Sequence, residues 1–202
     1  MIAAKRVLRY LRGTTKLGLT YSGGDKVFDM NEPLPIYIDT WTDADWGGDL
    51  TDRKSTTGYV IKIGGCSVSW ATKKQPTVAL STAEAEYMAI SAGMQESLSI
   101  QQLLYEILGT SIVNSACIIH TDNQTAISIS KDDVNHQRTK HIDIRHHFIR
   151  DHVRNGDMKL TWVPTAQQTA DILTKPLGKI QHTKLRHAIM NAQHTYSKGN
   201  KN

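Results

Sequence analysis

The sequence of 202 residues lacks the features of membrane-spanning, secreted and disulfide-stabilised proteins. No run approaches the ~18 consecutive apolar residues that a transmembrane helix needs. Basic residues interrupt the apolar stretch at the N-terminus instead of preceding it, which is not the pattern of a signal peptide. Only two cysteines occur, Cys66 and Cys117, too few for a disulfide framework or a zinc cluster. We therefore expect a soluble intracellular protein that makes no membrane contact and keeps two buried thiols reduced.

The motifs of several enzyme classes are also missing. There is no glycine-rich phosphate loop, no GxSxG nucleophile motif and no CxxC pair. The composition is that of an ordinary globular protein, with 39% hydrophobic and 21% charged residues, which excludes a disordered or collagen-like chain. The length allows one domain, or one domain with an appendage.

The net charge of +5 is unevenly distributed along the chain. Residues 1–16 and residues 178–202 each contain five Lys or Arg and no acid, whereas residues 17–177 contain 14 basic and 19 acidic residues. Basic ends are compatible with nucleic-acid binding and equally with a solvated surface. The acidic middle raises the question of which carboxylates hold cations.

Hydrophobic periodicity and turn residues predict a mixed α/β sheet flanked by helices. A capping box of Ser81 and Glu84 begins a long helix, which Gly93 is expected to bend or weaken. Gly64 and Gly65 are expected to join two strands into a hairpin. The expected strands are 18–22, 36–45, 58–63, 66–70, 117–122 and 158–163, and the expected helices are 2–12, 82–108, 123–130, 141–156 and 165–175.

Six acidic residues occupy strand ends or the helices beside them, where open α/β folds gather their sites. They are Asp43 and Asp45 after one strand, Asp122 after another, Glu84 and Glu86 in the long helix, and Asp171 in the last helix. A helix turns by about 100° per residue, so Glu86 borders the apolar face directed at the sheet, whereas Glu84 points to water. That face is expected to consist of Ala85, Ala89, Ala92, Leu103 and Ile107.

Four carboxylates brought together from two strand ends and two helices would form an all-oxygen site. Such a site suits two hard divalent ions, which clamp the attacking water and the leaving oxygen of a phosphodiester. Mutual repulsion of the carboxylates explains why the site would need metal to be stable. The residues alone favour Glu86 over Glu84 and leave the choice between Asp43 and Asp45 open.

Seven linked motifs, spread in order over residues 2–177, resemble the ribonuclease H region of the Pol polyprotein of copia-type LTR retrotransposons. They are LRYLRGT with GLTYS, TDADWGGD, DRKSTTGYV, SWATKKQPTVALSTAEAEYMA, HTDNQTAI, RTKHIDIRHHFIRD and ADILTKPL. The resemblance implies the ribonuclease H fold, a five-stranded mixed sheet flanked by helices. It also implies hydrolysis of the RNA strand of RNA/DNA hybrids during reverse transcription, with two Mg²⁺ ions that Mn²⁺ can replace.

Matched by motif, the resemblance assigns catalysis and metal binding to Asp43 in TDAD, Glu86 in AEYMA, Asp122 in TDNQ and Asp171 in TADIL. It implies that one ion activates a water molecule and that the other stabilises the 3′ leaving oxygen. The 2′-hydroxyls in the minor groove would distinguish hybrid from duplex DNA, and phosphate contacts would add affinity. The candidate nucleic-acid contacts are Arg53, Lys54, Lys73, Lys74, Asn123, Gln124, Arg138, Lys140 and Arg145.

The resemblance also divides the chain into three parts. Residues 1–24 correspond to the tail of the reverse transcriptase connection, with a basic helix and a short strand. Residues 25–177 correspond to the ribonuclease H domain, and residues 178–202 to a basic helix with a flexible tail. The expected partners are RNA/DNA hybrid and the reverse transcriptase of the same polyprotein. The expected location is the cytoplasm, in a virus-like particle, or the nucleus.

The sequence departs from many cellular ribonucleases H in one loop. VPTAQQTAD, before the last acid, lacks the histidine that those enzymes carry, which affects expected turnover more than metal binding. The polymerase's adjacent aspartates and the integrase zinc motif are absent, so we expect a remnant or a piece of a longer protein.

Two other functions stay open, namely a catalytically silent remnant that binds nucleic acid and a structural module of a larger reverse transcriptase. In the second, the basic N-terminal helix would be the docking surface. A DDE-type integrase core is disfavoured because its glutamate comes late, whereas Glu86 lies between the first two aspartates. The tryptophans lie in predicted strands or at strand ends, which favours core positions for them over base stacking. They are Trp41, Trp46, Trp70 and Trp162.

Overall fold

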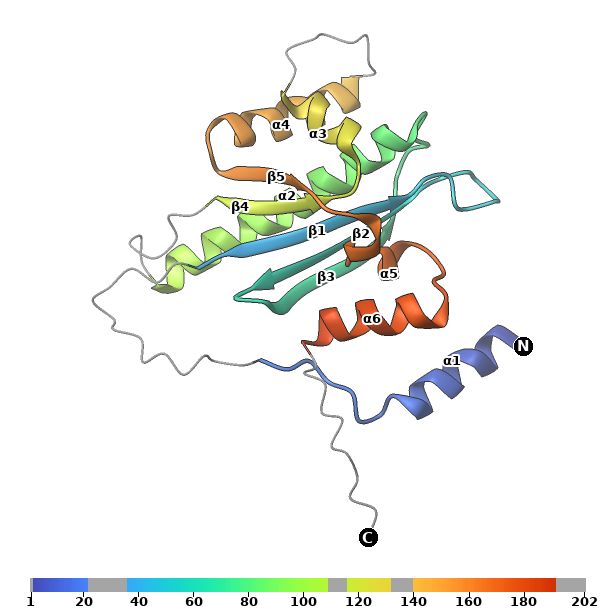
Figure 1. The fold of residues 1–202 in the computed structure, drawn as a ribbon. Helices are drawn as coiled ribbons and strands as arrows, with labels where there is room; N and C mark the ends of the chain where they lie inside the picture. Colours follow the sequence, from blue (N-terminus) through green and yellow to red (C-terminus); the bar gives the residue numbers. More distant parts are fainter. Residues whose placement is uncertain (1, 22–35, 109–115, 132–139, 192–202) are drawn as a thin grey trace.

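The computed structural model describes residues 2–21, 36–108, 116–131 and 140–191, apart from the side chains of residues 129, 131 and 140–143. Five strands form one sheet in the order β3-β2-β1-β4-β5. They are β1 (Ile38–Asp45), β2 (Thr56–Ile63), β3 (Cys66–Lys74), β4 (Cys117–Thr121) and β5 (Met158–Trp162). β2 pairs antiparallel with β1 and β3, whereas β1, β4 and β5 run parallel. This mixed sheet with its helices confirms the expected ribonuclease H-like α/β fold (Figure 1).

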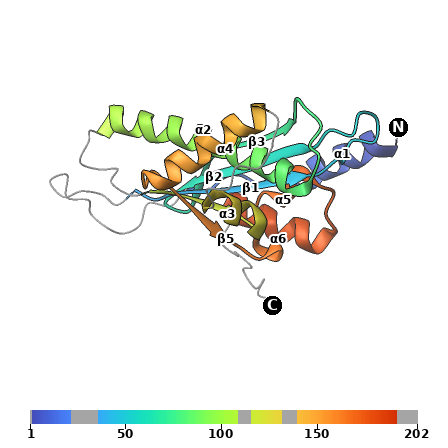
Figure 2. The same cartoon turned by 90° about the horizontal axis from the view of Figure 1, so that it is seen from above.

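Helices cover both faces of the sheet (Figure 2). α2 (Thr82–Leu108) and α4 (Lys140–Arg154) lie on one face, and α3 (Gln124–Lys131) contacts both of them. On the other face, the 3-10 turn η1 (Thr165–Gln167) leads into α5 (Asp171–Thr174), and α6 (Lys179–Met190) follows. α1 (Ile2–Gly13) lies apart from the sheet and buries none of its residues. None of the described helices is both long and apolar enough to cross a bilayer.

Local sequence signals explain the β2–β3 hairpin and the start of α2. Gly64 and Gly65 have φ angles of 56° and 81°, which other residues rarely adopt, and they form the expected turn. The Ser81 hydroxyl accepts a hydrogen bond from the Glu84 amide at 3.1 Å. The Glu84 carboxylate accepts one from the Leu80 amide at 2.8 Å. The expected N-terminal cap of α2 is thus confirmed.

α2 packs closely on β1 because small residues line the contact. A Cβ atom at Gly93 would lie 2.5 Å from Cγ2 of Thr42. One turn later, the Ser97 hydroxyl shares a 2.7 Å hydrogen bond with the hydroxyl of Thr40. The helix continues through Gly93 without interruption, so the glycine allows close approach to the sheet.

The apolar face expected for α2 is correct only in the first half of the helix. Ala85 and Ala89 are fully buried, but Leu103 and Ile107 are 53% and 66% exposed. Leu104 packs against the core in their place. In the middle of α2, the face that contacts the sheet consists of glycine and serine. The spacing of apolar residues therefore does not identify the buried face beyond that point.

Two other expected elements differ in the structure. The described part of the expected strand 18–22 pairs with no strand, because the Thr20 amide binds the carbonyl of Met190 at the end of α6 (3.0 Å). The expected helix 165–175 is divided into η1 and α5. Its interruption lies at Gln168, whose backbone is extended with a ψ of 99°.

The cysteines and tryptophans differ in burial. Cys66 and Cys117 are buried, as expected, and burial raises the pKa of the Cys117 thiol to about 12. Trp41 stacks on His120 with the ring centres 4.5 Å apart. The expectation of core positions is wrong for three tryptophans, because they follow β1 or belong to the edge strands β3 and β5. Trp46, Trp70 and Trp162 are 49%, 50% and 46% exposed.

α6 is anchored to the sheet by its second half. Leu185 is only 2% exposed. Lys62 of β2 donates a hydrogen bond from Nζ to the Ala188 carbonyl at 2.8 Å, and the Ser67 hydroxyl donates to the Ile189 carbonyl at 2.7 Å. The expected domain division after residue 177 stays a prediction.

Candidate metal centre and nucleic-acid surface

Three of the four candidate acids come together at one edge of the sheet. Asp43 belongs to β1, Asp122 directly follows β4, and Glu86 lies near the start of α2. Because β1 and β4 are adjacent and parallel, their carboxyl ends meet at the same edge (Figure 1). One oxygen from each of the three carboxylates lies within 4.8 Å of the others. All-oxygen donors at this spacing fit a hard divalent cation such as Mg²⁺.

Glu86 is buried without full hydrogen bonding. Glu86 is 7% exposed, and its Oε1 accepts a hydrogen bond from the Ala44 amide at 3.3 Å. Among the described residues, Oε2 has no hydrogen-bond partner. Burial, followed by the charges of Asp43 and Asp122, raises the pKa of Glu86 well above its ordinary value. A cation between these groups would relieve both the desolvation and the repulsion.

The fourth acid, Asp171, begins α5 and lies beside Asp43. It is 4% exposed, and burial followed by the charge of Asp43 raises its pKa to about 6. Lys175 connects the two carboxylates, with Nζ 3.0 Å from Asp171 Oδ1 and 3.4 Å from Asp43 Oδ1. The Thr174 hydroxyl donates a hydrogen bond to Asp43 Oδ2. Asp171 is therefore linked to the other acids through Asp43.

The loop before α5 fastens the two strand ends that carry Asp43 and Asp122. Gln168 is fully buried, and its Nε2 donates to the carbonyl of Thr42 at 3.0 Å and to that of His120 at 3.5 Å. In the same loop, the Thr165 hydroxyl donates to Asp122 Oδ2 at 2.8 Å. These contacts hold the strand ends together and orient the Asp122 carboxylate.

The sequence analysis missed Gln168, Thr174 and Lys175 as parts of the site. Their only signal was proximity to Asp171 along the chain, because a buried amide or hydroxyl has no distinctive spacing. The two rival acids lie elsewhere. Asp45 is outside the carboxylate group, and Glu84 caps α2.

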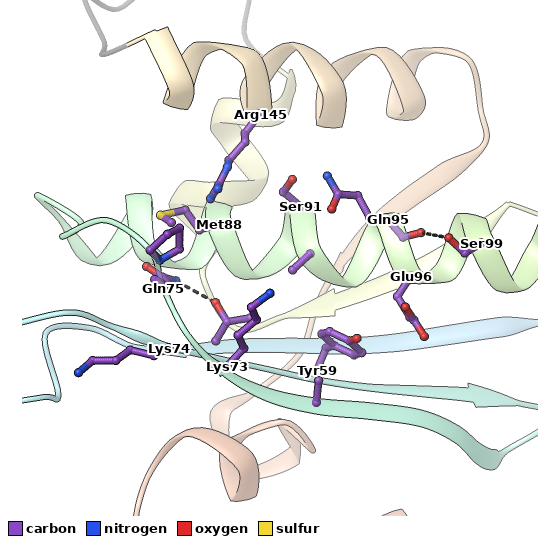
Figure 3. A pocket seen from close by; sticks show the side chains of 14 residues that line it. Tyr59, Lys73, Lys74, Gln75, Met88, Ser91, Gln95, Glu96, Ser99 and Arg145 are labelled. Atoms are coloured by element: carbon purple, nitrogen blue, oxygen red, sulfur yellow. Dashed lines mark hydrogen bonds between the residues drawn. The ribbon is translucent and has the colours of Figure 1, made fainter.

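Three candidate nucleic-acid contacts, Lys73, Lys74 and Arg145, line a groove of about 440 Å³ between the sheet and α2. Lys73 of β3 and Arg145 of α4 line it from two sides, and Gln95 and Glu96 line it farther along α2 (Figure 3). Lys74 also lines the groove, but its side chain extends toward the loop after β1 (Figure 3). Its ammonium group pairs with Asp49 and, at 2.9 Å, with Asp52, which lowers the pKa of both acids. Lys74 therefore fastens the loop after β1.

The other candidate contacts have different surroundings. Asn123 caps α3, since its Oδ1 accepts a hydrogen bond from the Ala126 amide at 3.0 Å. Gln124 and Arg53 are exposed, and Lys54 is half-buried. Arg138 and the side chain of Lys140 lie outside the described part of the chain. Binding by any of these residues stays a prediction.

No protein-family model matches the chain. It is 39% identical over 173 residues to the retrovirus-related Pol polyprotein from transposon TNT 1-94 of Nicotiana tabacum, which covers 86% of this chain and 12% of that protein. It is 38% identical over 178 residues to the retrovirus-related Pol polyprotein from transposon RE2 of Arabidopsis thaliana, covering 88% of this chain and 12% of that protein.

Among solved structures, ribonuclease H1 of Halobacterium salinarum NRC-1 is similar with a TM-score of 0.49 and 15% identity, over 68% of this chain and 94% of that chain. A likeness at this level supports no inference about activity. The sequence relatives are more informative, although this chain spans about 12% of their length. Their 38–39% identity extends over most of the chain and agrees with the motifs. The chain is therefore homologous to one segment of the Pol polyproteins of copia-type retrotransposons.

Proposed function

We propose that this chain is a retrotransposon ribonuclease H that hydrolyses the RNA strand of RNA/DNA hybrids during reverse transcription. The reaction would require two Mg²⁺ ions, held by the carboxylates of Asp43, Glu86, Asp122 and Asp171. It includes the reverse transcriptase of the same polyprotein as partner, in cytoplasmic virus-like particles or in the nucleus.

The observation that carries the proposal is the group of Asp43, Glu86 and Asp122. Three carboxylates within 4.8 Å, two of them buried, are unfavourable unless a cation joins them. The unpartnered Oε2 of Glu86 offers a free ligand atom. Homology to Pol polyproteins supports RNA/DNA hybrid as the substrate, because reverse transcription produces such hybrids.

Each residue would have a separate task. Bound divalent ions would supply an activated water and neutralise charge at the scissile phosphate. Asp43, Glu86 and Asp122 would hold these ions, and Asp171 would complete the set from α5. Gln168 would keep the β1 and β4 ends in register, so that the carboxylates need little reorganisation.

Substrate binding would rest on charge and on the minor groove. Lys73 and Arg145 present cations from two elements to the same groove, which suits a nucleic-acid phosphate. Gln124 is exposed two residues after Asp122 and offers an amide to the 2′-hydroxyls that distinguish RNA.

The test is cleavage of a labelled RNA/DNA hybrid, with duplex DNA and duplex RNA as controls, in Mg²⁺, Mn²⁺ or EDTA. We expect hybrid-specific cutting that EDTA abolishes. Asp43→Asn should reduce the rate at least about 100-fold, because removing one ligand charge weakens the ion site. Asp45→Asn makes the same chemical change outside the carboxylate group and should stay within about threefold of wild type. Equal rates for the two variants would contradict the proposal.

A second candidate function is a structural module of a larger reverse transcriptase. α1 supports it, because Val7, Leu8 and Leu11 are 58%, 66% and 54% exposed on a helix that buries nothing. A folded chain that binds hybrid without cutting it, and cuts once the polymerase segment is added, would favour this function. A chain that binds hybrid but cuts under neither condition would be a silent remnant.

A further inference from the structure

Lys175 places a positive charge inside the carboxylate site. Its Nζ lies 3.0 Å from Asp171 Oδ1 and 3.4 Å from Asp43 Oδ1. The side chains of Asp171 and Asp43 are 5% and 1% exposed, whereas that of Lys175 is 33% exposed. The ammonium group is thus a cation that the chain itself supplies to two buried acids.

Glu86 and Asp122 lack the direct contact with Lys175 that Asp43 and Asp171 have. Within the ranges that the structure describes, no ion pair involves Glu86 or Asp122. Both of these acids share the 4.8 Å group with Asp43, and Oε2 of Glu86 lacks a hydrogen-bond partner there. Asp43 therefore belongs to two groups, one with Glu86 and Asp122, and one with Asp171 in which Lys175 is the cation.

We propose that Lys175 is an internal counter-ion that occupies one of the two cation positions and must move away before a divalent ion binds there. The inference rests on the proposed function. An ammonium group and a divalent ion cannot both lie about 3 Å from the same carboxylates, because they repel each other strongly in a buried site. The four-carbon stem of Lys175 and its partial exposure allow the charge to swing into solvent.

The two cation positions are consequently unequal. The first ion binds among Asp43, Glu86 and Asp122 without displacing any charge. The second ion, between Asp43 and Asp171, competes with Lys175 and binds more weakly. In return, Lys175 holds Asp171 beside Asp43 in the metal-free protein, which makes it a positioning residue.

The test is calorimetric titration of the whole chain with Mg²⁺, together with thermal unfolding in EDTA and in Mg²⁺. Wild type should show two binding events that differ at least about tenfold in Kd. In Lys175→Met the weaker Kd should fall at least about fivefold. Its Tm should fall in EDTA and recover in Mg²⁺, because the ion replaces the lost charge. Lys175→Arg retains a cation and should keep the weak second event.

Lys179→Met is the matched control, since it removes the same charge from an exposed residue at the start of α6. It should titrate like wild type. A second measurement uses wild type and so does not depend on a variant that folds. Acylation of Lys175 is followed by mass spectrometry during a Mg²⁺ titration. The acylation rate should be low in EDTA and in low Mg²⁺ and should increase when the second site fills.

Unchanged Mg²⁺ affinities in Lys175→Met, or unchanged acylation across the titration, would overturn the inference while leaving hybrid cleavage intact. Absence of any Mg²⁺ binding and of cleavage in wild type would overturn the proposed function and this inference with it.

Discussion

At Glu86 and Asp171, two carboxyl groups are buried beside other carboxylates without enough donors to compensate them. Both have raised pKa values, and burial is the largest cause in each case. A raised pKa means that the folded chain holds the proton more tightly than the unfolded chain does. The resulting stability is complete below the ordinary pKa of about 4 and is lost as the pH rises through the folded value.

We therefore predict that the metal-free protein becomes more stable between about pH 7.5 and pH 5.5. For Asp171, whose folded pKa is about 6, the gain is about 0.8 kcal/mol over this window. Thermal unfolding in EDTA at a series of pH values measures it. Asp171→Asn removes one of the two titrating groups and should reduce the gain, and saturating Mg²⁺ should flatten the profile in wild type. A metal-free Tm that falls steadily from pH 7.5 to 5.5 would contradict this explanation.

At the scale of elements, the approach of α5 to β2 depends on Gly58. A Cβ atom there would lie 2.6 Å from Thr174 Cγ2 and 3.0 Å from Leu173 Cβ. The contact brings Asp171 and the Thr174 hydroxyl to Asp43. A four-residue helix is too short to form by itself, so its position comes from this packing.

We predict that Gly58→Ala displaces α5, lowers the free energy of unfolding by about 1 to 3 kcal/mol and slows hybrid cleavage at least about tenfold. Urea denaturation and the cleavage assay measure the two effects. Gly178→Ala is the matched control, because a Cβ atom at that position meets nothing within 4 Å. Wild-type stability and rate in Gly58→Ala would show that α5 does not depend on this contact.

Features of the elements that depend on neighbouring residues were predictable from the sequence, whereas those that depend on residues distant along the chain were not. The cap at Ser81 and the turn at Gly64 and Gly65 were predictable because short-range hydrogen bonds and φ angles decide them. The break at Gln168 was not, because its amide is satisfied by carbonyls of β1 and β4 that lie far away in sequence. In the site, residue types and spacing singled out Glu86, whereas Asp43 was chosen over Asp45 from the motif resemblance alone, and the fold places Asp43 beside Glu86.

For the whole molecule, the two terminal helices contribute unequally to the core. α1 buries no residue, whereas α6 buries Leu185 against the sheet. Residues 17–202 contain 19 basic and 19 acidic residues, so the net charge of +5 equals that of residues 1–16.

We predict that deleting residues 1–12 changes the Tm by less than about 2 °C, because α1 buries no residue and Tyr10, which contacts His182 of α6, is 41% exposed. Leu185→Ala, in contrast, should cost about 2 to 5 kcal/mol of unfolding free energy. Calorimetry of the two variants makes the comparison. A truncated chain as unstable as Leu185→Ala would mean that α1 belongs to the folded body.

The central claim is that carboxylate-held ions activate a water molecule to cut the RNA strand of a hybrid. The most direct measurement is the chemistry of the product ends, after cleavage of a hybrid with labelled RNA in Mg²⁺ by wild type and by Asp122→Asn. Attack by water with departure of the 3′ oxygen leaves a 3′-hydroxyl and a 5′-phosphate, and the variant should give no such products. Ends with 2′,3′-cyclic phosphate, or cleavage that survives EDTA or the Asp122→Asn change, would contradict the account.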